Sequence, residues 1–267
     1  MTIGVAFFVK NCLHYTQECL ASLQVSSKYH VLVVDDFSSD GTKSFLAETA
    51  EAFSGFAADV PAEDRNMQGF SMILDPPVPS LGARWNLAME YFKDLECEAV
   101  LLCNNDIVFH PKTVDVLVER LHAGDEALVT AHNVRDSMQV AMLNGLVLPS
   151  LEEASEAPHP DFSCMLLRTA AWEQVGGFSE AFIPCYFEDN HFHTMLKIHD
   201  LVAVSTTAAP YIHFGSVSQN QVPGGVCTGA RFEANRQKFV EIFGSLPDEI
   251  DIPQLRKQFL GEKQEIA

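Results

Sequence analysis

The sequence predicts an α/β fold in which a mostly parallel central sheet is flanked by helices. Short runs of apolar residues without polar alternation, as at 31–34 and 99–103, are typical of strands buried on both faces. These runs end abruptly in polar residues, and stretches with helical spacing of apolar residues follow them. Strands that alternate with helices in this order build parallel sheets, so we expect strand, loop and helix units packed into one core.

The size and composition fit one folded domain. The chain has 267 residues, of which 47% are hydrophobic, and 19 of them are phenylalanines. A chain of this length buries one large core or at most two small domains. We predict one domain over residues 1–244 and a C-terminal polar tail at 245–267, because the chain turns polar beyond Gly244.

The charge and the cysteines argue against several classes of protein. A formal net charge of −19 disfavours an extended face for nucleic-acid phosphates. The seven cysteines are an odd number without a CxxC pair, which indicates buried thiols in a reducing compartment rather than a disulfide framework or a zinc site. No apolar segment approaches the roughly 20 residues of a membrane span. The first residues, MTIGVAFFVKN, are more typical of a buried strand than of a signal peptide, so we expect a cytoplasmic protein without a transmembrane segment.

The first elements follow from the spacing of apolar residues. We predict strands at 3–9 and 31–34, each followed by a helix in which aromatic or apolar residues recur at fourfold spacing. Prolines between residues 57 and 79 limit regular structure, so we expect a loop with a short strand at 71–74. A helix at 82–95 follows, with an apolar stripe along one side.

Two carboxylates, Asp35 and Asp36, directly follow the strand at 31–34. They either form a turn and cap the next helix, or accept hydrogen bonds from a base or from ribose hydroxyls beyond the strand end. Arg84, near the start of the helix at 82–95, faces the same end of the sheet. It is either an ordinary surface residue or a contact for a phosphate or a base.

The stretch AVLLCNNDIVFHP at 99–111 is the centre of the predicted site. Its apolar run stops at Asn104, Asn105 and Asp106, and ligands of parallel sheets bind beyond the carboxyl ends of the strands. A carboxylate flanked by amides there can hold a hard cation that already carries phosphate oxygens. The alternative is an aspartate that ends a strand and opens a turn. We expect Pro111 to be the first residue of the following helix.

The second half of the chain is less regular. We predict strands at 127–131, 140–148 and 201–205, an acidic loop at 152–161, a short helix that stops at Gly176 and Gly177, and a last helix that ends near Phe243. Residues 219–229 are rich in glycine and polar residues, which is typical of a mobile lid or of an ordinary solvated loop.

Two further positions in this half carry candidate chemistry. Glu188 and Asp189 precede a stretch with helical spacing, where negative charge is stabilised by the helix start. They either cap that helix or supply a general base that faces the crevice. His213 follows a proline-containing segment, and a neutral imidazole is a good metal ligand.

Four segments occur together in an order that resembles a known family. They are VVDDFSSDGT, LLCNNDIVFHP, VGGFSEAF followed by YFEDNHF, and IHFGSVS. Together they resemble the inverting nucleotide-sugar glycosyltransferases of the large family 2 type, which have the GT-A fold, a single Rossmann-like nucleotide-diphospho-sugar transferase domain. The resemblance covers residues 3–244, and it implies a nucleotide-binding half at 1–110 and an acceptor-binding half at 111–244.

The resemblance implies a donor site at the ends of the first strands. Asp36, with Asp35, would contact the uracil or ribose of a nucleotide donor, and Val9 with Asn11 would line the same pocket. The predicted donor-binding residues are Val9, Asn11, Asp35, Asp36, Arg84 and Asn105.

The resemblance also implies roles in metal binding and catalysis. Asp106 would bind a divalent cation, Mn²⁺ or Mg²⁺, that bridges the donor diphosphate, with His213 as a second protein ligand. Asp189 would be the base that deprotonates an acceptor hydroxyl, and Glu188 would be its neighbour or position the substrate. A cation on the diphosphate would also explain how an acidic protein binds an anionic ligand.

Two departures from the family pattern affect these expectations. Asn104 and Asn105 replace acids that are often found in the metal motif, so the metal is expected to be held weakly or mostly through the donor. Phe37 stands where the family usually has glycine or another small residue, so an altered base pocket is expected.

The implied function is transfer of a sugar from a nucleotide sugar to an acceptor hydroxyl, with inversion at the anomeric carbon. A UDP-sugar is the favoured donor. The alternative is a catalytically silent protein that keeps the fold and binds a nucleotide sugar or a glycan. A nucleotidyltransferase would need a glycine-rich and basic loop after the first strand, and residues 10–13 are not such a loop. The acceptor stays open between a glycan, a protein and a modified base.

Overall fold

The computed structural model describes residues 1–134, 155–157, 160–215, 217 and 225–261. Among these residues, nine strands form one sheet in the order β3-β2-β1-β4-β8-β6-β9-β5, and β7 pairs with β9. The strands are β1 (Thr2–Val9), β2 (Lys28–Asp35), β3 (Met67–Leu74), β4 (Ala99–Asn104), β5 (Ile107–Phe109), β6 (Leu128–Asn133), β7 (Ser155–Glu156), β8 (Cys164–Arg168) and β9 (Ala203–His213). Strands β1 to β4 pair in parallel, as do β6 and β9, whereas β8, β5 and β7 run antiparallel to their partners. The predicted mostly parallel α/β sheet is confirmed.

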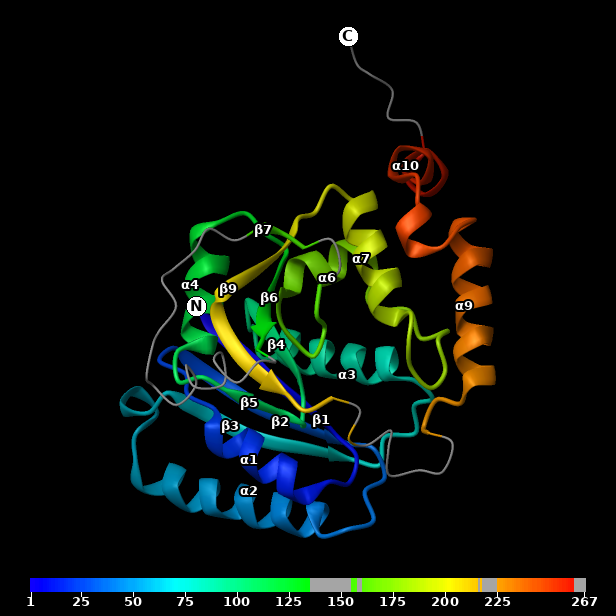
Figure 1. Cartoon of the computed structure of the whole chain (residues 1–267). Coiled ribbons are helices and arrows are strands. Elements are labelled where there is room, and N and C mark those ends of the chain that lie inside the picture. Colours follow the sequence, from blue (N-terminus) through cyan, green and yellow to red (C-terminus); the bar gives the residue numbers. More distant parts are fainter. Residues whose placement is uncertain (135–154, 158–159, 216, 218–224, 262–267) are drawn as a thin grey trace.

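Helices cover both faces of this sheet (Figure 1). They are α1 (Leu13–Ser22), α2 (Thr42–Asp59), α3 (Leu81–Asp94), α4 (Thr113–Ala123), α6 (Thr169–Val175), α7 (Glu188–Ile198), α9 (Gly229–Phe243) and α10 (Ile252–Leu260). Side chains alternate along β1, so Val5 and Phe7 join the core under α1, α2 and α4, while Ala6 and Phe8 join the core under α3, α6 and α7. This two-sided burial explains why the strand sequence lacks polar alternation.

The predicted strands and helices of the first half are present, with one underestimated element. Strand β3 has eight residues instead of the short segment expected at 71–74. It lies at the edge of the sheet, and its side chains are only partly buried, so its sequence lacks the apolar run of the central strands. Pro111 is not the first residue of a helix: it lies in a turn, and α4 begins at Thr113.

The second half departs further from expectation. Strand β8 was not predicted, because its apolar run continues directly into α6 and has no turn residues to separate the two elements. Strand β9 continues beyond the strand expected at 201–205 and passes through Pro210, and its register with β6 shifts between Ser205 and Pro210. The strand expected at 140–148 lies outside the described residues, as does most of the segment at 219–229.

The chain after Gly244 contains more structure than the expected polar tail. A 3₁₀ turn at Pro247–Glu249 leads into α10, which packs on α7. Leu255 of α10 is buried in a third apolar cluster with Phe182, Phe187, Ile198, Phe239 and Phe243. This cluster packs α9 and α10 against α7, with α10 at the C-terminal end of α7.

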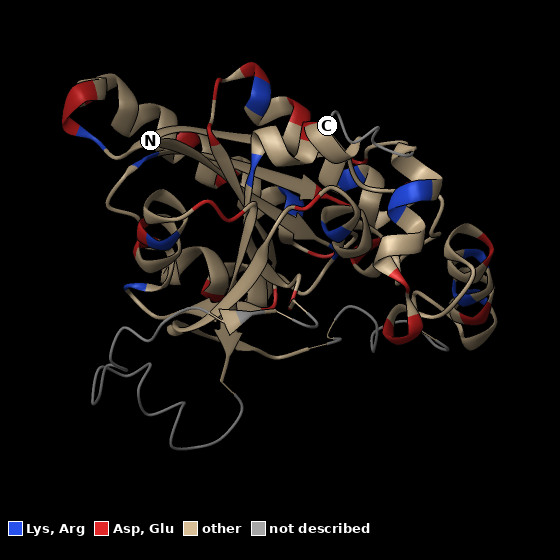
Figure 2. Cartoon of the chain, turned by 90° about the horizontal axis from the view of Figure 1, so that it is seen from above, with Lys and Arg blue, Asp and Glu red and all other residues tan. Residues whose placement is uncertain are grey.

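Charged residues lie mostly outside the sheet (Figure 2). Lys and Arg side chains are scattered over several elements among more numerous Asp and Glu side chains, as the net charge of −19 requires. All seven cysteines are free thiols, and six of them are buried, as the sequence predicted.

Phe37 does not line the cavity described below, and it is 55% exposed with a φ angle of 57°. A bulky side chain in this left-handed region is strained, which explains why glycine suits the position. We expect Phe37→Asn to be about 1 kcal/mol more stable than Phe37→Ala, because asparagine tolerates this conformation and both variants lack the ring. Urea unfolding measures the difference. Equal midpoints for the two variants would contradict the strain.

Candidate functional site

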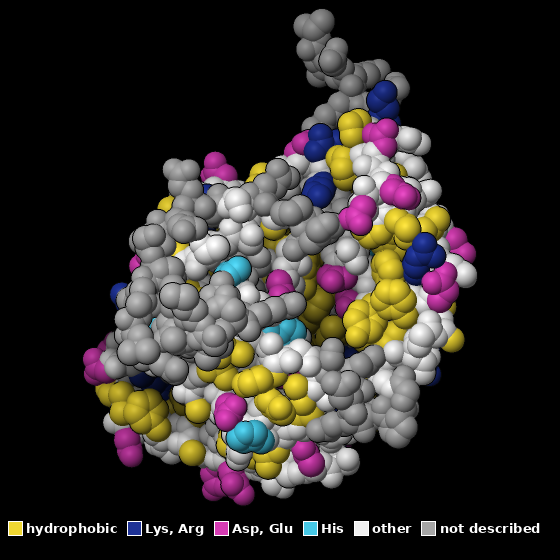
Figure 3. Space-filling view, in the orientation of Figure 1, with side chains coloured by type: hydrophobic (Ala, Val, Ile, Leu, Met, Phe, Trp, Pro, Cys, Tyr) yellow, Lys and Arg dark blue, Asp and Glu magenta, His cyan; other side chains and the backbone are white. Residues whose placement is uncertain are grey.

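A cavity of about 370 Å³ opens at the carboxyl ends of β1, β2 and β4. Figure 3 shows it as a hollow with acidic side chains and a histidine side chain beside it. The sequence-predicted site residues that line this cavity are Val9, Asp36, Arg84, Asn105, Asp106, Glu188, Asp189 and His213. Asn11 and Asp35 do not line it. The structure therefore brings eight of the ten predicted residues together, although they come from distant parts of the sequence.

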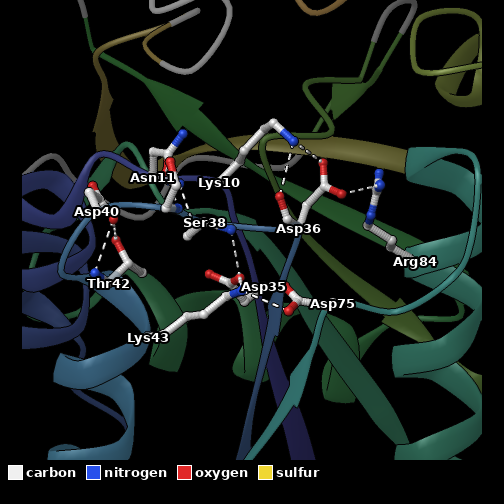
Figure 4. Close-up of polar contacts among 11 residues, drawn as sticks. Lys10, Asn11, Asp35, Asp36, Ser38, Asp40, Thr42, Lys43, Asp75 and Arg84 are labelled. Atoms are coloured by element: carbon white, nitrogen blue, oxygen red, sulfur yellow. Dashed lines mark hydrogen bonds and ion pairs between the residues drawn. The ribbon is translucent and has the colours of Figure 1, made fainter.

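Asp36 lies between two cations on the cavity wall (Figure 4). Lys10 Nζ is 2.9 Å from one carboxylate oxygen of Asp36, and Arg84 Nη2 is 2.5 Å from the other. Lys10 Nζ also donates to the backbone carbonyl of Asp36 at 3.0 Å. Lys10, which the sequence did not indicate as a site residue, lines the cavity together with Arg84. These two cations supply positive charge where an anionic ligand would enter an otherwise acidic protein.

Asp35 is completely buried, and Figure 4 shows it beside Lys43 and Asp75. Its Oδ1 accepts the backbone N–H of Ser38 at 2.9 Å, and the Lys43 ammonium, which pairs with Asp75, lies 3.9 Å from the same oxygen. The turn-forming alternative therefore describes the observed contacts of Asp35. Neighbouring residues at a strand end project to opposite sides of the sheet, so the side chains of Asp35 and Asp36 point in different directions.

Asn11 braces the loop behind Asp36 rather than facing the cavity. Its backbone N–H donates to Ser38 Oγ at 2.6 Å, and its Oδ1 accepts the backbone N–H of Ser39 at 2.7 Å. Its φ angle of 54° lies in the left-handed region, which asparagine adopts more easily than most residues. Asn11 thus ties the exit of β1 to the turn after β2, next to Lys10 and Asp36.

Asp106 and His213 meet through the pairing of two strands. Ile107 of β5 pairs with His213 of β9, and His213 Nε2 lies 3.2 Å from Asp106 Oδ1. The backbone N–H of Phe214 donates to the Asp106 carbonyl at 2.9 Å. Asp106 is only 6% exposed. The pairing holds a nearly buried carboxylate and an imidazole together at the cavity.

The two asparagines before Asp106 have different partners. Asn104 Nδ2 lies 3.5 Å from His213 Nε2, at the cavity wall. Asn105 Nδ2 donates to Thr16 Oγ1 on α1 at 2.9 Å. Within the part of the chain that the structure describes, no group of three or more His, Cys, Asp or Glu residues is arranged to hold a metal. Asp106 and His213 therefore form a two-residue donor set that would need ligand oxygens to complete a coordination shell.

Glu188 and Asp189 begin α7, directly after two residues with left-handed backbone. Tyr186 and Phe187 both have a φ angle of 77°, which is unusual for bulky residues and often marks a functional site. Glu188 is 4% exposed, and its Oε2 has no hydrogen-bond partner among the described residues. Asp189 Oδ1 accepts the backbone N–H of Asn190 at 2.8 Å.

Burial raises the pKa of both carboxyl groups. For Glu188, desolvation acts first and the nearby Asp189 charge second, and the pKa lies well above its usual value. Desolvation also raises the pKa of Asp189, although backbone N–H groups that favour the charged form act against it. A carboxylate with a raised pKa is a stronger base, as proton abstraction requires. The raised pKa values thus favour the interpretation of these residues as a general base over helix capping alone.

Glu188→Gln is expected to change how stability depends on pH. An acid with a raised folded-state pKa stabilises the folded state fully below its unfolded pKa, near 4.5, and loses this contribution as the pH rises through the folded value. Above pH 4.5 the wild type should therefore lose stability relative to Glu188→Gln, while below it their difference should be constant. Urea unfolding between pH 4 and pH 9 measures this, with Glu48→Gln on the exposed side of α2 as control. Parallel curves for wild type and Glu188→Gln would contradict it.

Sequence reasoning missed other residues of the cavity wall. Asp161 Oδ1 accepts the Ser163 hydroxyl at 2.6 Å, and that hydroxyl lies 2.5 Å from the buried Tyr211 hydroxyl. Asp161, Ser163 and Tyr186 all line the cavity. Asp161 lay in a predicted acidic loop, and only the unpredicted β8 brings it to the site. Tyr186 stands two residues before Glu188, and this closeness to a predicted site residue was the one local sign that Tyr186 would reach the cavity.

Residues 5–143 match the model of the family described as Glycosyl transferase family 2. No match was found among curated protein sequences. Two similar solved structures are a mannosyltransferase, PcManGT from Pyrobaculum calidifontis, in complex with GDP-Man and Mn²⁺, and S. aureus TarS 1–349 in complex with UDP-GlcNAc.

The likeness to these structures concerns the fold. PcManGT is 15% identical with a TM-score of 0.58, over 79% of this chain and 56% of that chain. The TarS structure is 17% identical with a TM-score of 0.59, over 97% of this chain and 72% of that chain. This chain thus spans little more than half of the PcManGT chain. The sheet and its helices match the GT-A glycosyltransferase fold, as predicted. Of the helices that the structure describes, none is both long and apolar enough to cross a membrane.

Proposed function

The chain belongs to glycosyl transferase family 2, and we propose that it transfers a sugar from a UDP-sugar or another nucleotide-diphosphate sugar to an acceptor hydroxyl, with inversion at the anomeric carbon. One observation carries the proposal. A single cavity brings together a carboxylate held by two cations, a carboxylate with an imidazole, and a carboxylate pair at a helix start. These groups suit the nucleoside and the diphosphate of the donor and the hydroxyl of the acceptor, in that order.

The nucleoside would bind at Asp36. A carboxylate accepts hydrogen bonds from the imide of uracil or from ribose hydroxyls, and Asp36 is held in place by Lys10 and Arg84. The Arg84 guanidinium has further N–H donors, and its planar fork suits phosphate oxygens. Val9 lines the same wall.

The diphosphate would lie toward Asp106 and His213, which would hold a divalent cation. The donor set fits a divalent cation, because a carboxylate suits both Mg²⁺ and Mn²⁺ and a neutral imidazole is also a good metal ligand. A bound cation would offset the charge that develops on the leaving nucleoside diphosphate. Because the described part of the chain supplies only two strong donors here, the cation should bind tightly only with the nucleotide present.

Asp189 would take the proton of the acceptor hydroxyl as the new bond forms. A sugar hydroxyl is a weak nucleophile near neutral pH, and a carboxylate with a raised pKa within hydrogen-bond reach is a suitable base. Attack from the face opposite the leaving group inverts the anomeric centre. NMR of the first-formed product tests this step, and retained configuration would refute it.

Nucleotide binding tests the donor site independently of the acceptor. Calorimetric titration with UDP and with GDP in the presence of Mn²⁺ should show binding of at least one, and Arg84→Ala should weaken it by roughly 10- to 100-fold, since hydrogen bonds between charged groups contribute about 1.5–3 kcal/mol. Lys93→Ala is the control because it removes an exposed cation away from the cavity. A wild-type protein that binds neither of these nucleotides would refute a UDP- or GDP-sugar as the donor, and one that binds no nucleoside diphosphate would refute the proposal.

A catalytically silent protein is the second candidate. Asn104 and Asn105 leave Asp106 as the one carboxylate of the motif, which is the observation that favours it. Nucleotide binding without turnover of any donor sugar would support this candidate. The cytoplasmic location expected from the sequence stays a prediction.

A further inference from the structure

We propose that Tyr186, supported edge-on by Phe232, forms an acceptor subsite in which the Tyr186 ring stacks against the apolar face of a neutral saccharide. The proposal rests on the proposed function, because it names the acceptor of the same cavity. It selects the saccharide from the three acceptor classes that the sequence left open. We call the two rings the aromatic platform.

One ring of the aromatic platform, Tyr186, lines the cavity, and the other, Phe232, packs against it outside the lining. Tyr186 lines the cavity and is 37% exposed, while Phe232 on α9 is 42% exposed. Their ring centroids are 5.5 Å apart with an interplanar angle of 69°, and Phe187 packs beneath Phe232 at 5.3 Å. Figure 3 shows hydrophobic side chains gathered beside the hollow on the side of α9. Two exposed rings thus continue the wall of the cavity onto the surface.

The segment that carries Tyr186 is held rigidly in an unfavourable conformation. The φ angle of Tyr186 is 77°, a region that bulky residues rarely adopt. The side chain of Asn235, which is 3% exposed, donates from Nδ2 to the carbonyls of Ile183, Cys185 and Tyr186 at 3.3, 2.9 and 3.3 Å. Backbone strain persists where the surroundings enforce it, and it gathers at ligand sites. The Tyr186 ring is therefore exposed but fixed in position by the buried Asn235 amide, as a ligand-binding ring would be.

The chemistry next to the aromatic platform suits a sugar. Asp189 follows Tyr186 by three residues, and Asp161 and Glu188 line the same cavity. A pyranose ring offers C–H groups on one face, which pack on an aromatic ring, and hydroxyls at its edge, which donate to carboxylates. An acceptor stacked on Tyr186 would present an edge hydroxyl to Asp189.

The local charge selects against anionic acceptors. Two carboxylates, Asp161 and Asp189, face this part of the cavity beside Glu188, and the cations Lys10 and Arg84 are engaged with Asp36. Repulsion between like charges would weaken a nucleic acid or another polyanion here. A neutral saccharide meets neither this repulsion nor the cost of stripping water from a charge.

Saturation-transfer NMR tests the aromatic platform directly. The probes are the methyl glycosides of glucose, galactose, mannose and N-acetylglucosamine, with and without UDP, and uridine, thymidine and a serine-containing peptide form the comparison arms. We expect at least one glycoside to show transfer to the C–H protons of one ring face. Tyr186→Ala should weaken its binding about tenfold, whereas Tyr186→Phe, which keeps the ring, should retain it. Phe56→Ala, which removes an exposed ring on α2, should change nothing.

Three results would overturn the proposal: no glycoside binds, Tyr186→Ala binds glycosides as tightly as wild type, or only a nucleoside or the peptide shows transfer from Tyr186. The UDP arm separates this failure from that of the proposed function. UDP binding without glycoside binding refutes the aromatic platform alone, and glycoside binding without UDP binding supports the platform while it refutes UDP as the donor nucleotide.

Discussion

Asp189→Asn is expected to lower the rate of sugar transfer by roughly 10²- to 10⁴-fold, the usual contribution of a general base. Asparagine keeps the size of the side chain and can accept a hydrogen bond, but it cannot take a proton from the acceptor. Asp189 lies at the start of α7 on the cavity wall, where burial raises its pKa. The affinity for the nucleotide should stay close to that of wild type, because Asp36, Lys10 and Arg84 are untouched.

Steady-state transfer kinetics and nucleotide titration together measure this separation. Asp94→Asn, at the exposed end of α3, is the matched control and should keep the wild-type rate. The wild-type rate should rise with pH until the raised pKa of the base is passed. Transfer that persists in Asp189→Asn with an unchanged pH profile would show that another group takes the proton, with Glu188 the next to test.

Asp106→Asn and metal removal form the second large prediction. Loss of the cation should lower turnover by roughly 10²- to 10³-fold, since stabilising the leaving diphosphate contributes several kcal/mol. Asp106 is the one carboxylate of the motif, so Asp106→Asn should weaken metal binding strongly even with the nucleotide present, although phosphate oxygens would still be available to the cation.

The measurement compares turnover after chelation with EDTA and after readdition of Mn²⁺. Readdition should restore the wild type and should leave Asp106→Asn inactive. His213→Gln should have an intermediate effect that excess Mn²⁺ partly corrects, because the carboxylate remains. A wild type that keeps full activity in EDTA would contradict a metal at this site.

The site was predictable from sequence where it depends on strand ends. Asn104, Asn105 and Asp106 follow a fully apolar run, and this local pattern places them beyond β4 without further information. The same pattern indicated Asp35 and Asp36 but could not distinguish them. That distinction depends on which side of the sheet each residue faces, and only Asp36 turns toward the cavity.

Features that depend on contacts between distant segments could not be predicted in the same way. The distance of 3.2 Å between Asp106 and His213 depends on a three-residue strand, β5, which is too short to show a periodicity. Asp161 reaches the cavity because β8 inserts antiparallel between β4 and β6. Lys10 is one cation in a loop, and its role appears only through its contacts with Asp36.

Release of nucleoside diphosphate from a panel of UDP-, GDP- and other nucleotide sugars, with and without Mn²⁺, tests the central claim most directly. Wild type, Asp106→Ala and Asp189→Ala are compared under the same conditions with the glycoside panel present. We expect metal-dependent release from one class of donor that is lost in both variants. Release from no donor, or equal release by the wild type and both variants, would contradict a glycosyltransferase site at this cavity.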